Sequence, residues 1–185
     1  GYAPSATLGV VYFSDHYARH AAQLLEALQD EFPLVSDWTG AVGVGVIATQ
    51  VEYMGEPALS AMLLDLPAQS YRVFSGIAPL QPMGGSIWER ALVHADGELP
   101  DLPDLLVELA GRTQTKSLLG GVSSSIVSPL QLAWSKAQGP GHSGVLDGGL
   151  SGVAFAPAAG ALQALTQGCQ TTGARMRITA LQDNV

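Results

Sequence analysis

Glycine, serine and other small polar residues follow several predicted strands, where they would form the wall of a binding site. The first cluster holds Gly120, Gly121, Ser123 and Ser124. Glycines let a ligand approach the backbone closely, and serine hydroxyls and backbone N–H groups hydrogen-bond anionic or zwitterionic groups. An ordinary turn uses the same residue types, so the pattern alone leaves both interpretations open. With two later turns, the predicted ligand-binding set is Gly120, Gly121, Ser123, Ser124, Gly149, Ser151, Gln167, Gly168 and Cys169.

Cys169 is the single cysteine of the chain. A catalytic thiol needs a base and a lowered pKa, and no histidine lies near Cys169 in the sequence. We therefore expect Cys169 to pack inside the protein or to line the ligand site, and a cysteine-dependent enzyme is the alternative. A lone cysteine forms no disulfide within the chain, which agrees with a reducing, cytoplasmic compartment.

Histidine is the side chain that most often binds metals, and it also ligates haem iron. His16 and His20 are four residues apart at the start of a predicted helix, which places them on one helical face. A metal site needs three or four ligands, so two solvated histidines are the simpler interpretation. A haem or metal ligand at His16 or His20 is the alternative. His94 and His142 are isolated in the sequence.

Catalytic and nucleotide-binding motifs are missing from the sequence. Gly40, Gly43 and Gly45 lie inside an apolar run that no helical pattern follows, unlike the glycines of a dinucleotide-binding loop. The chain contains neither a Walker A pattern nor a G-x-S-x-G pattern. We therefore expect a binding protein rather than an enzyme, with no cofactor.

The composition limits the classes of partner. Charged residues are 13% of the chain, and the formal net charge is −8. An acidic surface repels both the phosphates of nucleic acids and anionic membranes, and no apolar run is long enough to span a bilayer. The low charge content is typical of a tightly packed body that buries part of its surface against another domain or subunit, so an oligomer is compatible with it.

The pattern of apolar residues predicts an α/β (α+β) fold with a mixed sheet and helices packed on it. A strand at residues 8–13 is followed at once by a helix from Ser14 to about Glu31, and a second helix runs from Asp101 to Gly111. The order of elements is not the regular alternation of a doubly wound fold. Further strands are predicted at residues 39–49, 58–64, 71–75, 118–122, 131–135, 150–156 and 176–181. Residues 76–98 are expected to be mostly irregular, with one strand near residues 88–94.

Two glycine-containing stretches near the end of the chain resemble the FIST family. They are Gly148-Gly149-Leu150-Ser151-Gly152-Val153 and Gln167-Gly168-Cys169, and the second is the more specific. The strand around residues 11–15, the glycine-rich residues 38–45, residues 56–59 and residues 119–121 complete the resemblance. It covers nearly the whole chain and is to the N-terminal FIST domain.

The resemblance implies a single N-terminal FIST domain over residues 1–185, without the C-terminal FIST domain that usually follows. It implies a sensory domain of signal transduction that binds a small polar metabolite such as an amino acid. A C-terminal FIST domain or a downstream signalling protein would be the partner. Some relatives are linked to haem and nitric oxide, which gives a haem-binding gas sensor as the first alternative. A structural or scaffold subunit is a further alternative.

Overall fold

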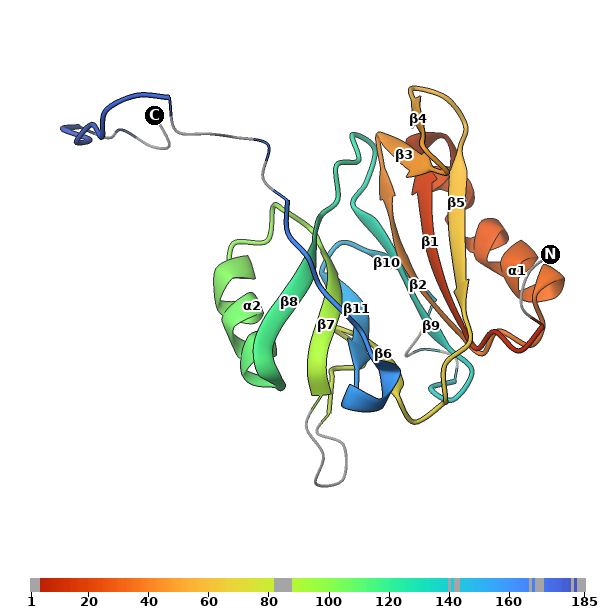
Figure 1. Cartoon of the computed structure of the whole chain (residues 1–185). Helices are drawn as coiled ribbons and strands as arrows, with labels where there is room; N and C mark the ends of the chain where they lie inside the picture. Colours follow the sequence, from red (N-terminus) through yellow and green to blue (C-terminus); the bar gives the residue numbers. More distant parts are fainter. Residues whose placement is uncertain are drawn as a thin grey trace.

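Two large sheets of this protein stack face to face, and a third sheet in the described residues is the two-stranded hairpin of β3 and β4 (Figure 1). The computed structural model describes residues 4–81, 88–139, 141, 144–166, 168, 172–180 and 182. In chain order, the elements are β1 (Leu8–Ser14), the 3-10 helix η1 (Asp15–His20), α1 (Ala21–Glu31), β2 (Asp37–Gly43), β3 (Gly45–Ala48), β4 (Val51–Met54), β5 (Leu59–Leu64), β6 (Tyr71–Ser75), β7 (Trp88–Ala95), α2 (Leu102–Gly111), β8 (Thr113–Val122), β9 (Leu130–Ser135), β10 (Gly144–Asp147), β11 (Leu150–Phe155) and the 3-10 helix η2 (Pro157–Ala159).

The first sheet has the strand order β10-β9-β2-β1-β5, and the second has the order β6-β11-β7-β8. In each sheet one pair of neighbours is parallel, β1 with β2 and β7 with β8, and the other pairs are antiparallel. A helix joins the two strands of each parallel pair, because parallel neighbours need a crossover connection. The crossover helices α1 and α2 cover the two outer faces, which gives four layers (Figure 1).

Three apolar clusters hold these layers together. One lies between α1 and the first sheet and includes Phe13 and Trp38, both fully buried. A second lies between the two sheets, where Leu8 and Val153 meet. The third lies between the second sheet and α2, around Trp88. Burying one such large apolar side chain stabilises a fold by about 2 kcal/mol. A shift of one residue in the strand register would turn these side chains away from their cluster, so their burial fixes the register.

The predicted fold class is confirmed, because the structure combines mixed sheets with helices packed on them. The division into two stacked sheets is an additional finding. The strand predicted near residues 88–94 is β7, and the helix predicted to end at Gly111 is α2. Within the described residues, no helix is long and apolar enough to cross a membrane.

Several predicted boundaries are wrong. The helix predicted from Ser14 is divided into η1 and α1, and the Ser14 hydroxyl does not cap it, because it donates to the Glu56 carbonyl oxygen instead. The strand predicted at residues 39–49 is two strands, since the chain leaves the first sheet after Gly43 and forms the hairpin β3–β4. Strand β8 begins at Thr113, earlier than predicted.

The strand predicted at residues 176–181 is also wrong for residues 176–180, which the structure describes without regular secondary structure. Met176 and Ile178 are exposed, and Figure 1 shows this segment extending away from the stacked sheets. An isolated strand is unstable because its backbone groups and apolar face need a neighbour. Within the described residues, the alternating apolar residues of this segment have no neighbouring strand to pair with.

Candidate functional site

The carboxyl ends of the two parallel strand pairs meet at one end of the stacked sheets. The Ser123 hydroxyl, just after β8, donates a hydrogen bond of 2.8 Å to the Val42 carbonyl oxygen near the end of β2. The Ser124 hydroxyl accepts a bond of 3.3 Å from the Val44 N–H. These two serines, both predicted as ligand contacts, therefore join the ends of the two sheets. In open α/β sheets, ligands bind beyond such carboxyl ends.

His94 lies at the centre of this end of the molecule. It is on β7, directly between Ser151 on β11 and Gly121 on β8. Its Nε2 lies 3.0 Å from the hydroxyl of Tyr12, which comes from β1 of the opposite sheet. We call Tyr12, His94, Gly121, Ser123 and Ser151 the carboxyl-end cluster. The structure thus brings three of the predicted site residues together, around a histidine that the sequence left isolated.

Burial shapes the chemistry of His94. The side chain is 3% exposed, and its Nδ1 has no hydrogen-bond partner among the described residues. Desolvation by burial lowers the pKa of His94 from 6.5 to about 4, so the imidazole is neutral at physiological pH. Burial likewise raises the pKa of Tyr12, whose hydroxyl keeps its proton. The pair therefore offers uncharged hydrogen-bonding groups.

A glutamine bridges the two sheets beside this cluster. Gln131, on β9 and fully buried, accepts a hydrogen bond of 2.6 Å from the Ser151 hydroxyl through its Oε1. Its Nε2 donates a bond of 2.8 Å to the carbonyl oxygen of Gly149. The predicted residues Gly149 and Ser151 are therefore held in place by a side chain of the opposite sheet.

Other predicted residues lie elsewhere. Gly120 lies beside Val93 of β7, and a Cβ there would lie 1.9 Å from the Val93 carbonyl oxygen. Gly168 is exposed, with open space around it. Gln167 and Cys169 lie outside the described residues. Their assignment to the ligand site stays a prediction.

The helical face predicted for His16 and His20 is wrong. Both residues are on the 3-10 helix η1, where residues four apart are separated by about 120° around the axis. Both side chains are exposed. No group of three or more His, Cys, Asp or Glu side chains with metal-binding geometry occurs in the described part of the chain.

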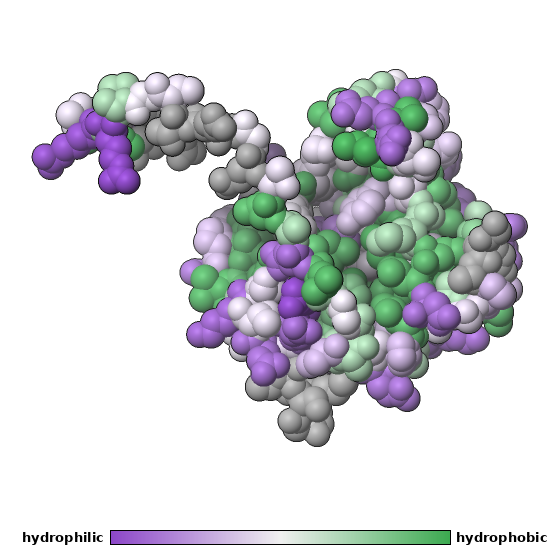
Figure 2. All heavy atoms as spheres, in the orientation of Figure 1, coloured by the Kyte–Doolittle hydropathy of each residue, from purple (hydrophilic) through white to green (hydrophobic). Residues whose placement is uncertain are grey.

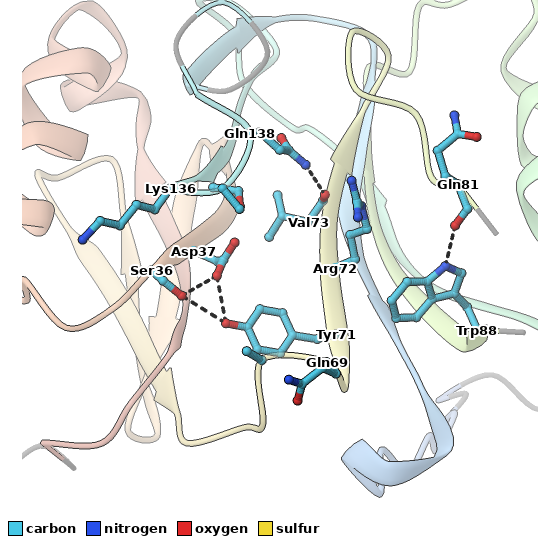
Figure 3. A pocket seen from close by; sticks show the side chains of 13 residues that line it. Ser36, Asp37, Gln69, Tyr71, Arg72, Val73, Gln81, Trp88, Lys136 and Gln138 are labelled. Atoms are coloured by element: carbon cyan, nitrogen blue, oxygen red, sulfur yellow. Dashed lines mark hydrogen bonds between the residues drawn. The ribbon is translucent and has the colours of Figure 1, made fainter. Parts of the chain in front are cut away.

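A cavity of about 630 Å³ lies at the opposite end of the stacked sheets, beside the first residues of β2 and β6 (Figure 3). We call it the Asp37 cavity. The Asp37 Oδ2 accepts a hydrogen bond of 2.5 Å from the Ser36 hydroxyl and lies 2.9 Å from the Tyr71 hydroxyl. Burial, the largest cause, raises the pKa of Tyr71. The phenol therefore stays protonated and holds the carboxylate in one orientation.

Opposite charges line this cavity without neutralising each other. Arg72 and Lys136 both line it, and neither forms an ion pair within the described residues. Asp37 has no ion-pair partner there either, and no hydrogen bond within the described residues reaches its Oδ1. Figure 3 shows Asp37 and Tyr71 on one side of Val73 and Arg72 on the other, whereas Lys136 extends away from them.

No local sequence pattern indicates this cavity. Asp37 and Tyr71 are far apart in the chain and come together only because β2 and β6 belong to sheets that stack. Asp37 precedes the strand predicted at residues 39–49, whereas in the structure it is the first residue of β2. The hydroxyls of Ser36 and Tyr71 fix the orientation of the Asp37 carboxylate. No spacing in the sequence predicts that Tyr71 lies beside Asp37.

The stacked sheets with one helix on each outer face define an α+β domain. The family model of the FIST N domain matches residues 7–185, and this protein belongs to that family. The resemblance seen in the sequence is therefore confirmed. FIST domains are sensory domains of signalling proteins. No curated protein and no solved structure significantly matches this chain.

Proposed function

We propose that this sensory domain binds a small zwitterionic metabolite, such as an amino acid, in the Asp37 cavity. The observation that carries the proposal is that Asp37 and Arg72 line one cavity and neither is ion-paired within the described residues. A ligand with an ammonium group and a carboxylate would supply an ion-pair partner for each of these two side chains. Charge-assisted hydrogen bonds of this kind are about twice as strong as neutral ones.

The arrangement of the two charges favours an extended ligand. Because Asp37 and Arg72 lie on opposite sides of Val73 (Figure 3), one molecule must reach past this strand residue to contact both. The guanidinium presents several donors in a planar fork that matches a carboxylate. A cavity of about 630 Å³ is within the usual range of small-molecule sites. Amino acids with a long or acidic side chain are therefore the best fit.

Binding of a zwitterion would also affect the contact between the two sheets. Ser36 and Asp37 lie where the connection from the crossover helix α1 enters β2, and Tyr71 begins β6. A ligand that stabilises these positions stabilises the contact between the two sheets. A C-terminal FIST domain or another signalling protein would respond to that change.

Thermal unfolding in the presence of amino acids tests the proposal. A ligand at 100 times its Kd adds about 2.7 kcal/mol to the apparent stability, which raises the Tm by about 5–10 °C in a domain of this size. We expect this rise with zwitterions and none with the matching amino acid amides or N-acetyl derivatives, which lack one of the charges.

Two variants assign the binding to this cavity. Asp37→Asn and Arg72→Gln should each remove the rise in Tm, because each removes one charge that contacts the ligand. Arg19→Gln is the matched control, since Arg19 is an exposed arginine on η1, away from the cavity. A rise in Tm that persists in both cavity variants, or its absence with every zwitterion, would contradict the proposal.

A further inference from the structure

The carboxyl-end cluster combines a buried, unsatisfied nitrogen with open space beside it. An unpaired buried polar group costs about 1–3 kcal/mol, so the His94 Nδ1, which lacks a partner among the described residues, is a position where a bound group is favoured. Gly121 is the neighbour of His94 on β8, and a Cβ added there would meet no atom within 4 Å. Open space therefore lies over Gly121, the residue next to His94 in the sheet.

The walls around this space are apolar and uncharged. Tyr12 and Met62 are 37% and 57% exposed, and Met62 is on β5, where it pairs with Val10 on the same face as Tyr12. Figure 2 shows hydrophobic side chains over β1 and β5 beside a hollow that separates them from the second sheet. Leu119, half-buried on β8, faces the same side as Gly121.

The charged groups near this end are already engaged. The Asp15 carboxylate accepts hydrogen bonds from the Ser125 hydroxyl and the Ile126 N–H. The Asp96 carboxylate accepts a bond of 2.9 Å from the Glu98 N–H. No lysine or arginine belongs to the carboxyl-end cluster, and His94 is neutral. An ionic ligand would have to lose its hydration without gaining a counter-charge, which is costly.

We propose that the carboxyl-end cluster is a second binding site, separate from the Asp37 cavity, for an uncharged aromatic molecule with one hydrogen-bonding group. The aromatic ring lies in the hollow between β5 and β8, over Gly121 and against the Tyr12 ring and Met62. The polar group of the ligand satisfies the His94 Nδ1. Offset and edge-on ring contacts with Tyr12 add to the burial of apolar surface.

Benzamide and benzoate form a matched pair of probes, because they share a shape and differ in charge. Titration of the whole protein with each, followed by the 15N resonances of selectively labelled histidine, reports on the His94 Nδ1 directly. We expect benzamide, and indole as a second uncharged probe, to shift this resonance and to raise the Tm. Benzoate should do neither at the same concentrations.

Gly121→Val fills the space over Gly121 and should abolish both effects of benzamide, while the variant is expected to fold because a Cβ there meets no atom within 4 Å and valine suits a strand. The same variant should still respond to zwitterions, and Asp37→Asn should still respond to benzamide, so the two sites fail independently. The proposal is overturned if neither uncharged probe shifts the His94 resonance, which would assign Nδ1 to a bound water. An equal response to benzamide in Gly121→Val would overturn it as well.

Discussion

The Tyr12 hydroxyl lies 3.0 Å from the Nε2 of His94, although the two residues belong to different sheets. Their rings meet edge to face, with centroids 5.5 Å apart and an interplanar angle of 77°. This contact joins the sheets at the end where both parallel strand pairs finish, and it fixes the orientation of a neutral imidazole.

Tyr12→Phe removes the sole hydrogen bond described for His94 and leaves both ring nitrogens unpaired in a buried site. The expected loss is about 1–3 kcal/mol in the free energy of unfolding, measured by urea titration. Tyr53→Phe is the control, because Tyr53 lies on the β3–β4 hairpin outside the two stacked sheets. Equal stability of the Tyr12 and Tyr53 variants would contradict a structural role for the contact.

The buried histidine makes stability depend on pH in a defined window. The pKa of His94 is about 4 in the folded protein and 6.5 when the chain is unfolded. Between these pH values the unfolded state binds more protons than the folded state. The free energy of unfolding therefore falls as the pH decreases from 6.5 to 4, and His94 adds no pH dependence above 6.5. The total decrease in the free energy of unfolding that His94 causes is about 3 kcal/mol.

His94→Asn tests this dependence, because the variant lacks the titrating group. Urea titrations at several pH values between 4 and 7 should show a shallower pH dependence for His94→Asn than for the original protein. His20→Asn, at an exposed histidine, should keep the original slope. If the slope is the same for all three proteins, another group is responsible.

Alanine substitutions at the adjacent glycines Gly120 and Gly121 on β8 should change the stability by different amounts. A Cβ at Gly120 would lie 1.9 Å from the Val93 carbonyl oxygen, and the φ of +130° is unfavourable for any side chain. Gly120→Ala should therefore cost more than about 1–3 kcal/mol, since the clash adds to the backbone strain. Gly121→Ala should change the Tm little, because its Cβ meets open space. Thermal melts of the two variants make the comparison, and equal Tm values would refute it.

Gln131→Met keeps the shape of the side chain that bridges the sheets but removes both of its hydrogen bonds. The Ser151 hydroxyl and the Gly149 carbonyl oxygen lose this partner, and the expected cost is about 1–3 kcal/mol. Adding Ser151→Ala to Gln131→Met should recover part of the loss, because it deletes the hydroxyl that lost its acceptor, whereas the Gly149 carbonyl oxygen still accepts from the Asp96 N–H. A double variant less stable than Gln131→Met would argue against this account.

The sequence predicted those parts of the fold that depend on local patterns. Strand β7 and helix α2 follow from periodicity and from a glycine at the helix end. The stacking of two sheets does not follow, because it depends on pairings between strands far apart in the chain, such as β2 with β9. The hairpin β3–β4 was missed for a related reason, since Gly43 ends one strand within a continuous apolar run.

The site could be predicted in part. Gly121 and Ser123 lie at the carboxyl end of β8, and Ser151 lies near the start of the antiparallel strand β11, which begins at the same end of the sheet. His94 was missed because an isolated histidine carries no spacing signal, and its importance comes from burial and from Tyr12 across the sheets. The Asp37 cavity depends entirely on residues brought together by the stacking.

The described strands begin in the first sheet, move to the second, return to the first and finish in the second. Strand β11, the last strand of the described residues, lies between β6 and β7. During translation the first sheet has all of its strands once Asp147 is made, whereas a nascent chain that stops before Leu150 has nothing to join β6 to β7. Products truncated before β11 would display unpaired strand edges on β6 and β7 that promote aggregation.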